Sequence, residues 1–423
     1  MKRLPRPVYL VSFLFLIIFL YQTSKELQSK NIFKFDIKQY LESRADDLQK
    51  KDAVSDNIIV RNYLNKINEV KNSGLKYILL WTSPNNLPFA YMGRGREVFV
   101  QRRCRYTNCF VTNDKKLLRD VSKFDVIAFA GPEVVYTPNS RLIPNIRSPH
   151  QKYVFASIES AGYYPVCSNR LDNFFNWTWT YRLNSDSRWG YLVVRDAEHK
   201  VIGPNIDMHW MKLDDMDPVS EELEALLKQK TLAAVWFVSN CKSKSSRERL
   251  AMYLESELEK YGLTLDIFGQ CGTLKCDGFD CFKRIQRHYY FYLSFENSFA
   301  EDYVTEKLLH ALRYNAIPIV YGGANYTRFM PDGIYLNARK LGVKKLARRM
   351  KYLIDHPNEY KEYFRWTNHY TYHGRNDDAE TDDYCGFCEL MNNEELVKNT
   401  TIYKHFREWW NDPHHNLHCQ IFG

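Results

Sequence analysis

Two apolar runs in the second half of the chain enclose a polar segment suited to binding a charged ligand. Phe291–Phe295 and Ile317–Tyr321 each indicate a buried strand, and Tyr303–Tyr314 between them indicates a helix with an apolar face. Ligands of such strand–helix–strand units bind beyond the carboxyl ends of the strands, where a helix N-terminus favours an anion. The polar residues at that end of the unit are Glu296, Asn297, Tyr303, Glu306 and Lys307.

Lys307 is the residue that points most directly to a phosphate group. A lysine in the first turns of a helix opposes the macrodipole, and a bound phosphate would compensate it. Glu306 is suited to accept hydrogen bonds from ribose hydroxyls, and Tyr303 is suited to cover a sugar or ribose face. The same residues also fit an ordinary surface Glu–Lys pair beside a half-buried tyrosine, because such pairs are common on helices.

Glu159 is the candidate general base. It directly follows the apolar run 153–158, and a carboxylate at the end of a buried strand is well placed to remove a proton near neutral pH. The alternative is a glutamate that caps a turn. Arg182 fits two roles equally: it could order the cleft or approach a bound ligand, or it could form a structural pair with Asp186.

Arg247 begins a predicted helix, Arg247–Tyr261, that follows a strand ending near Asn240. A guanidinium in this place can bind phosphate through two hydrogen bonds, although arginines at helix starts are usually solvated. The predicted helix and loop place Arg247 at a solvent-facing position. Asp215 and Asp217 have the spacing of metal-nucleotide sites. Their place just before a predicted helix favours capping and linker roles instead, so we predict no metal site.

The stretch 295–308, FENSFAEDYVTEKL, and the downstream IPIVYG resemble the donor-binding signature of the α1,3/α1,4-fucosyltransferase family. The segment ending in Ile158-Glu159-Ser160 and the block YRxxSD at 181–186 resemble two further blocks of that family. The likeness extends from about Leu75 to Tyr370. After Glu159 the chain departs from the usual ESP continuation, which puts the acceptor pocket in question.

The resemblance implies an inverting transfer of fucose from GDP-β-L-fucose to a sugar hydroxyl, with Glu159 as general base. It implies that Lys307 binds the diphosphate, Glu306 the ribose and Arg247 a phosphate. It also implies that no metal cofactor is essential, because Lys307 and Arg247 stabilise the charge on departing GDP. Glycan acceptors on glycoproteins are the implied partners, either the N-glycan core or the antennae. We predict as donor-binding residues Arg182, Asn240, Arg247, Glu296, Asn297, Tyr303, Glu306 and Lys307.

The N-terminus indicates a membrane anchor. Basic residues precede the apolar run 8–21, and no small-x-small cleavage site follows it, so we predict an uncleaved type II signal anchor after a cytosolic tail, residues 1–7. Residues 22–73 then form a stem, and with the family resemblance this predicts a Golgi enzyme with a lumenal catalytic region. The net charge of +9 is mild and acidic residues are interspersed, so nothing indicates a nucleic-acid partner.

Apolar runs alternate with helical segments after the stem, which predicts parallel α/β sheets. The family implies a GT-B-type fold with two facing Rossmann-like domains. We place an acceptor domain at residues 74–218, a GDP-fucose-binding domain at 219–395 and a tail at 396–423. A helix is predicted at residues 115–122.

Cysteines and glycosylation sequons agree with a secreted-pathway location. Behind a signal anchor, disulfides are a stronger interpretation than zinc for the cysteine clusters and the CxxC at 385–388. Connectivity stays open, as does the choice between an active enzyme and a catalytically silent sugar-binding relative. The sequons start at Asn176, Asn325 and Asn399, and the disulfide candidates are Cys104, Cys109, Cys271, Cys276, Cys281, Cys385, Cys388 and Cys419.

Overall fold

The computed structural model describes residues 74–135, 143–276, 280–411 and 419. The predicted anchor at 8–21 and the stem at 22–73 lie outside this part of the chain. Within it, no helix combines the length and the apolar character needed to cross a bilayer.

The first sheet contains six parallel strands in the order β2-β1-β3-β4-β5-β6. Continuous apolar runs form its central strands because both faces are covered, as is usual for parallel sheets. Phe129 of β3, for example, pairs in register with Phe155 of β4, and both side chains are buried. The strands are β1 (Lys76–Leu80), β2 (Cys109–Thr112), β3 (Val126–Ala130), β4 (Lys152–Ser157), β5 (Trp177–Thr180) and β6 (Ser187–Arg188).

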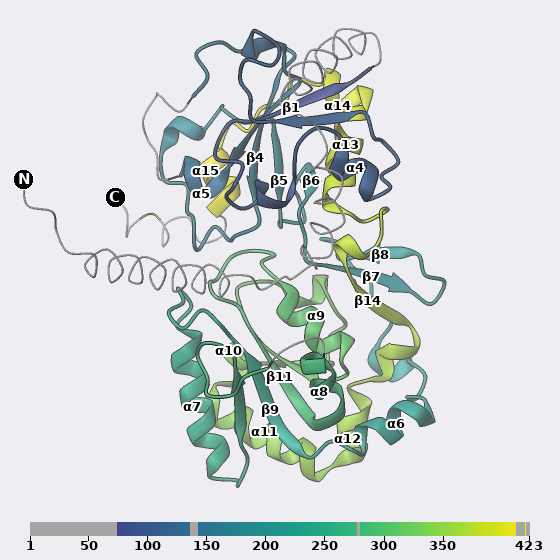
Figure 1. Cartoon of the computed structure of the whole chain (residues 1–423). Coiled ribbons are helices and arrows are strands. Elements are labelled where there is room, and N and C mark those ends of the chain that lie inside the picture. The colour runs from purple at the N-terminus through teal and green to yellow at the C-terminus, as the bar shows by residue number, and fades with distance from the viewer. Residues whose placement is uncertain (1–73, 136–142, 277–279, 412–418, 420–423) are drawn as a thin grey trace, which may run out of the picture. The chain divides into compact units, whose positions relative to one another are not determined.

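The second sheet contains five parallel strands in the order β10-β9-β11-β12-β13. Helices α7 (Arg247–Glu259) and α11 (Val343–Asp355) share one apolar core with this sheet (Figure 1). The strands are β9 (Leu232–Phe237), β10 (Leu265–Phe268), β11 (Tyr289–Phe295), β12 (Ile317–Tyr321) and β13 (Leu336–Asn337); further helices are α6 (Glu221–Leu227), α8 (Asp280–His288), α9 (Glu306–Arg313), α10 (Ala338–Leu341) and α12 (Pro357–Glu362). The predicted α/β class with two parallel sheets is confirmed.

A third, antiparallel sheet of order β14-β7-β8 was not predicted. It joins β7 (Leu192–Asp196) and β8 (Val201–Gly203) to β14 (Tyr370–Gly374), with Tyr372 opposite Val194. Helix α9 contacts β14, so this sheet supports the helix that follows the polar segment of the sequence.

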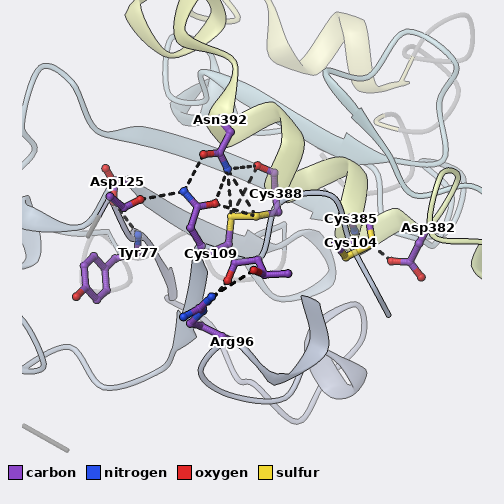
Figure 2. The surroundings of a disulfide bond; sticks show 12 residues. Tyr77, Arg96, Cys104, Cys109, Asp125, Asp382, Cys385, Cys388 and Asn392 are labelled. Atoms are coloured by element: carbon purple, nitrogen blue, oxygen red, sulfur yellow. Dashed lines mark hydrogen bonds between the residues drawn. A yellow bond between two sulfur atoms is a disulfide. The ribbon is translucent and has the colours of Figure 1, made fainter. Parts of the chain in front are cut away.

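The C-terminal helices, drawn in yellow, lie with the first sheet (Figure 1). Helix α13 (Asp383–Asn392) contacts β6 and α4 (Glu97–Gln101), and it is followed by α14 (Glu394–Lys398) and α15 (Phe406–Asn411). Helix α13 falls inside the predicted second domain, 219–395, but two disulfides attach it to the first sheet: Cys104–Cys385 and Cys109–Cys388 (Figure 2).

The helix predicted at residues 115–122 is wrong. The chain there forms turns and a 3-10 helix at Val121–Lys123. Aspartate side chains accept bonds from nearby backbone amides, Asp114 from Lys116 and Asp120 from Ser122, and these local bonds compete with a helix. Arg119 adopts a left-handed φ of 65°, which a helix interior does not allow.

Candidate active site

Glu159 lies just beyond the carboxyl end of β4, as the sequence predicted. It is half-buried, and its Oε2 accepts a hydrogen bond of 3.1 Å from the hydroxyl of Tyr303. Tyr303 belongs to the loop between β11 of the second sheet and α9. One hydrogen bond therefore joins the candidate base to the segment that carries the candidate donor-binding residues.

The loops around this bond touch at further points. The hydroxyls of Ser160 and Ser298 are hydrogen-bonded, and a Cβ on Gly162 would lie 2.7 Å from the carbonyl oxygen of Phe299. The small residues that follow Glu159 therefore let the two loops approach closely. The side-chain amide of Asn240 also donates to the hydroxyl of Tyr163 at 3.1 Å, so the loop after β9 meets the loop after β4.

Glu296 anchors the start of α9. It is 1% exposed, and its Oε1 accepts hydrogen bonds from the backbone amide of Thr305 at 2.9 Å and from its hydroxyl at 3.0 Å. Thr305 is the N-cap residue of α9, which begins at Glu306 and not at Tyr303. Glu296 thus replaces the side-chain cap that the helix lacks, and its position suits a supporting role behind the donor-binding residues.

Lys307 lies between two carboxylates. Its ammonium nitrogen is 2.8 Å from Oε1 of Glu306 and 3.3 Å from Oε2 of Glu296, and it also donates to the Thr305 hydroxyl at 2.7 Å. The lysine is therefore compensated by protein carboxylates even without a phosphate group. Asn297 is half-buried beside this cluster, and its Oδ1 accepts a bond of 2.9 Å from the Ser298 hydroxyl.

The charges of this cluster depend on one another. Burial alone would raise the pKa of Glu306, but the attraction and hydrogen bond of Lys307 outweigh it and lower that pKa to about 2. Burial raises the pKa of Glu296, against the opposing attraction of Lys307. Burial would lower the pKa of Lys307, yet the two carboxylates raise it, so the lysine stays charged at neutral pH.

Arg247 is buried, which corrects the prediction of a solvent-facing residue. It is 3% exposed, and its guanidinium donates to the carbonyl of Phe295 at 2.7 Å and to that of Asn240 at 3.3 Å. The arginine ties the end of β9 to the end of β11. Its Nε is buried and has no hydrogen-bond partner among the described residues.

Arg182 contacts the C-terminal helix α15, and this contact was not predicted from the sequence. It is 4% exposed, its guanidinium donates to the carbonyls of Trp409 and Trp410, and it lies over the Trp409 ring. Asp186, its predicted alternative partner, accepts bonds from Thr178 and Tyr403. These contacts attach the segment that follows β5 to α15.

The acidic pair considered for a metal lies in the connection to the second sheet. Asp215 ends a short 3-10 helix, and the carboxylate of Asp217 lies 3.4 Å from Nε2 of His369. In the described part of the chain, the one grouping of three potential metal ligands is Cys104, Asp382 and Cys385. The two cysteines of that group are joined in a disulfide and do not offer thiolates.

All the predicted disulfide candidates are bonded, and two cysteines were missed. Cys167 pairs with Cys419, and Cys276 pairs with Cys281. Cys241 pairs with Cys271, and this bond attaches the loop containing Asn240 to the segment after β10. Free cysteines are absent from the described residues. An even cysteine count was the signal that could have included Cys167 and Cys241.

The sequons differ in their exposure. Asn325 and Asn399 are exposed. Asn176 is 8% exposed, and its Nδ2, the atom that carries a glycan, donates to the carbonyl of Thr401 at 3.0 Å. Its predicted use as a glycosylation site therefore disagrees with the folded structure, because a glycan would have to replace this buried contact.

Two Rossmann-like sheets with charged side chains at the strand ends are typical of a nucleotide-binding enzyme of the α/β class. Residues 73–192 match the family model "Fucosyltransferase, N-terminal", and residues 227–410 match "Glycosyltransferase family 10 (fucosyltransferase) C-term". The chain belongs to this family, the fucosyltransferases of glycosyltransferase family 10.

Named relatives agree with that assignment. Alpha-(1,3)-fucosyltransferase C of Drosophila melanogaster is 35% identical over 374 residues, covering 84% of this chain and 83% of the relative. Glycoprotein 3-alpha-L-fucosyltransferase A of the same organism is 30% identical over 358 residues, covering 82% of this chain and 62% of the relative.

A crystal structure of an alpha1,3-fucosyltransferase with GDP-fucose is similar at 15% identity and a TM-score of 0.45, covering 78% of this chain and 92% of that one.

Proposed function

We propose that this chain is an α-(1,3)-fucosyltransferase that transfers L-fucose from GDP-β-L-fucose to N-acetylglucosamine of glycoprotein glycans with inversion. The observation that carries the proposal is the contact between Glu159 and Tyr303. It places a carboxylate at the end of β4 next to the loop that leads into Glu306 and Lys307. Base and donor-binding candidates are far apart in the sequence, and this contact brings their segments together.

In the proposed reaction the acceptor hydroxyl oxygen forms a bond to C1 of fucose. The bond from C1 to the phosphate oxygen breaks, and GDP leaves with the electron pair. Glu159 takes the proton of the hydroxyl, as positioned carboxylates do in related glycosyl chemistry. Attack opposite to the departing GDP converts the β-linkage of the donor into an α-linkage.

The charge that grows on GDP needs a fixed cation. Lys307 is the strongest candidate because it stays charged and lies in the first turn of α9, where backbone amides also favour an anion. Glu306, partly exposed and ionised, is suited to bind the ribose hydroxyls. Asn240 and Asn297 complete the proposed donor site, with Arg247 and Glu296 supporting its backbone.

A catalytically silent sugar-binding relative was the alternative. The two relatives named above are fucosyltransferases, and the chain has a carboxylate at 159 together with the Glu306–Lys307 pair. A silent binding protein has no need of a base in contact with the donor segment. We therefore favour the active enzyme.

We further propose a Golgi enzyme of type II topology, anchored by residues 8–21, with glycans on Asn325 and Asn399. The basic residues before the apolar run and the pairing of all described cysteines support this location, since disulfides persist in oxidising compartments. Fluorescence microscopy against a Golgi marker and a mass shift on deglycosylation would test it.

The activity test is transfer by the purified full-length chain. GDP-fucose is supplied with a panel of defined glycans containing either core or antennal N-acetylglucosamine, and products are analysed by mass spectrometry. We expect a fucosylated product with EDTA present, because Lys307 takes the place of a divalent ion at the diphosphate. No transfer to any acceptor of the panel would contradict the proposal, and activity restored by manganese alone would contradict its metal-independent form.

A further inference from the structure

A pair of tyrosines holds the residue proposed as the base. The Tyr303 hydroxyl donates to Oε2 of Glu159 at 3.1 Å, and the Tyr191 hydroxyl donates to the backbone carbonyl of Ile158 at 2.7 Å. The rings of Tyr191 and Tyr303 meet edge to face with centroids 6.3 Å apart. One phenol thus contacts the carboxylate, and the other contacts the backbone just before it.

The Tyr303 ring cannot move freely. It is 2% exposed, and it packs edge to face on Tyr181 with centroids 4.9 Å apart. The Tyr181 hydroxyl in turn accepts a bond of 3.1 Å from the backbone amide of Ala161. The Tyr303 hydroxyl is therefore held in place because its ring packs on Tyr181, which is itself bonded to the loop that follows β4.

We propose, building on the function above, that Tyr303 is a positioning residue that fixes the Glu159 carboxylate through Oε2 and leaves Oε1 to receive the acceptor proton. This role differs from the donor contact implied for Tyr303 by the family resemblance. Tyr191, which sequence analysis did not single out, holds the backbone of the same segment.

Two physical arguments support this role. A general base must lie within hydrogen-bond reach of the proton it removes, and a half-buried glutamate on a loop has several rotamers unless a neighbour selects one. Tyr303 also keeps its own proton, because burial, and then the nearby Tyr191 and Glu159, raise its pKa well above the usual range. It is therefore a hydrogen-bond donor at any pH at which the enzyme works.

The position of Tyr303 adds a link to the donor. Only Val304 stands between it and Thr305, whose amide and hydroxyl are bonded to Glu296 at the start of α9. The charged and titratable groups around Tyr303 and Glu159 are Tyr181, Arg182, Tyr191, Glu296, Asp302 and Glu306. Glu296 and Glu306 are paired with Lys307, and Asp302 is paired with Arg328, whereas Oε2 of Glu159 is bonded by the Tyr303 hydroxyl.

The test is Tyr303→Phe in the full-length chain, assayed for fucose transfer. The variant keeps the ring and loses only the hydroxyl. We expect kcat to fall about 10-fold. The affinity for GDP should stay within about twofold, since the hydroxyl contacts Glu159 and not the donor.

Tyr360→Phe is the matched control. Tyr360 is also 2% exposed, and its hydroxyl donates to the carbonyl of Tyr290 at 2.8 Å, so this variant measures the loss of a buried phenol elsewhere. It should leave kcat within about twofold of the parent chain. Replacing Tyr303 with p-aminophenylalanine keeps a donor at the same place and should restore most of kcat, which also covers the case that Tyr303→Phe does not fold.

Weaker GDP binding with an unchanged kcat would overturn the proposal and make Tyr303 a donor ligand. A full 10-fold loss when Tyr303→Phe is added to Glu159→Gln would also overturn it, because a positioning residue has no effect once its base is gone. Failure of the proposed function looks different. In that case Glu159→Gln alone would retain transfer, whatever Tyr303→Phe does.

Discussion

The ammonium of Lys307 lies 3.3 Å from Oε2 of Glu296, a carboxylate that is 1% exposed. The lysine is thus both the proposed cation for the diphosphate and the partner of a buried charge. Substituting it removes both interactions at once. A test of Lys307 must therefore separate ligand binding from stability.

Lys307→Met should weaken GDP binding at least 10-fold and lower the free energy of unfolding by about 2 kcal/mol, because Glu296 loses its compensating charge. Isothermal titration calorimetry with GDP and urea unfolding measure the two effects. In the double variant Lys307→Met/Glu296→Gln the buried carboxylate is gone, so stability should largely return while GDP binding stays weak. Recovery of GDP affinity in the double variant would show that Lys307 only supports the loop.

Arg247→Met should unfold more easily than the parent chain. The guanidinium donates hydrogen bonds to the carbonyls of Asn240 and Phe295. Leaving these carbonyls unpaired in the interior lowers the free energy of unfolding by about 1–3 kcal/mol. Arg249→Met on the same helix is the control, because Arg249 is exposed and should change stability by less than about 0.5 kcal/mol. Equal melting temperatures for the two variants would argue against the structural role of Arg247.

His310 should make the protein less stable in mild acid. Burial lowers its pKa to about 4 from an unfolded value near 6.5 and outweighs the attraction of Glu306. The unfolded chain therefore binds more protons between these values, so stability is lost as pH falls from about 6.5 to about 4, by at most about 1.4 kcal/mol for each pH unit.

Urea unfolding between pH 4.5 and pH 7 measures this slope. His310→Gln should flatten it, whereas His209→Gln, at an exposed position, should leave it unchanged. A slope that persists in His310→Gln would assign the acid sensitivity to other groups.

The parallel strands could be predicted because each is a continuous apolar run, as in β4, β11 and β12. The third sheet could not be predicted, because the pairing of Tyr372 with Val194 joins residues far apart in the chain. The same reason explains the placement of α13, whose cysteines reach back to Cys104 and Cys109 over separations of 281 and 279 residues. Local patterns carry no information on such pairings.

The same distinction between local patterns and distant contacts applies to the candidate site. Glu159, Glu306 and Lys307 could be predicted as candidates because each stands at the end of a strand or the start of a helix, which the sequence marks. The burial of Arg182 and Arg247 was missed. Their partners are backbone carbonyls of distant segments, at Trp409 and Trp410 for one and at Phe295 for the other. Side-chain type does not reveal such partners.

The rate of a single turnover by Glu159→Gln tests most directly whether Glu159 removes the acceptor proton. Saturating GDP-fucose and acceptor isolate the chemical step, and GDP affinity is measured in parallel as the control for an intact donor site. We predict a rate about 10²–10⁴-fold below the parent chain, the usual contribution of a positioned base, with GDP affinity unchanged. A variant that retains most of the rate, or that is slow because it no longer binds GDP, would contradict the account.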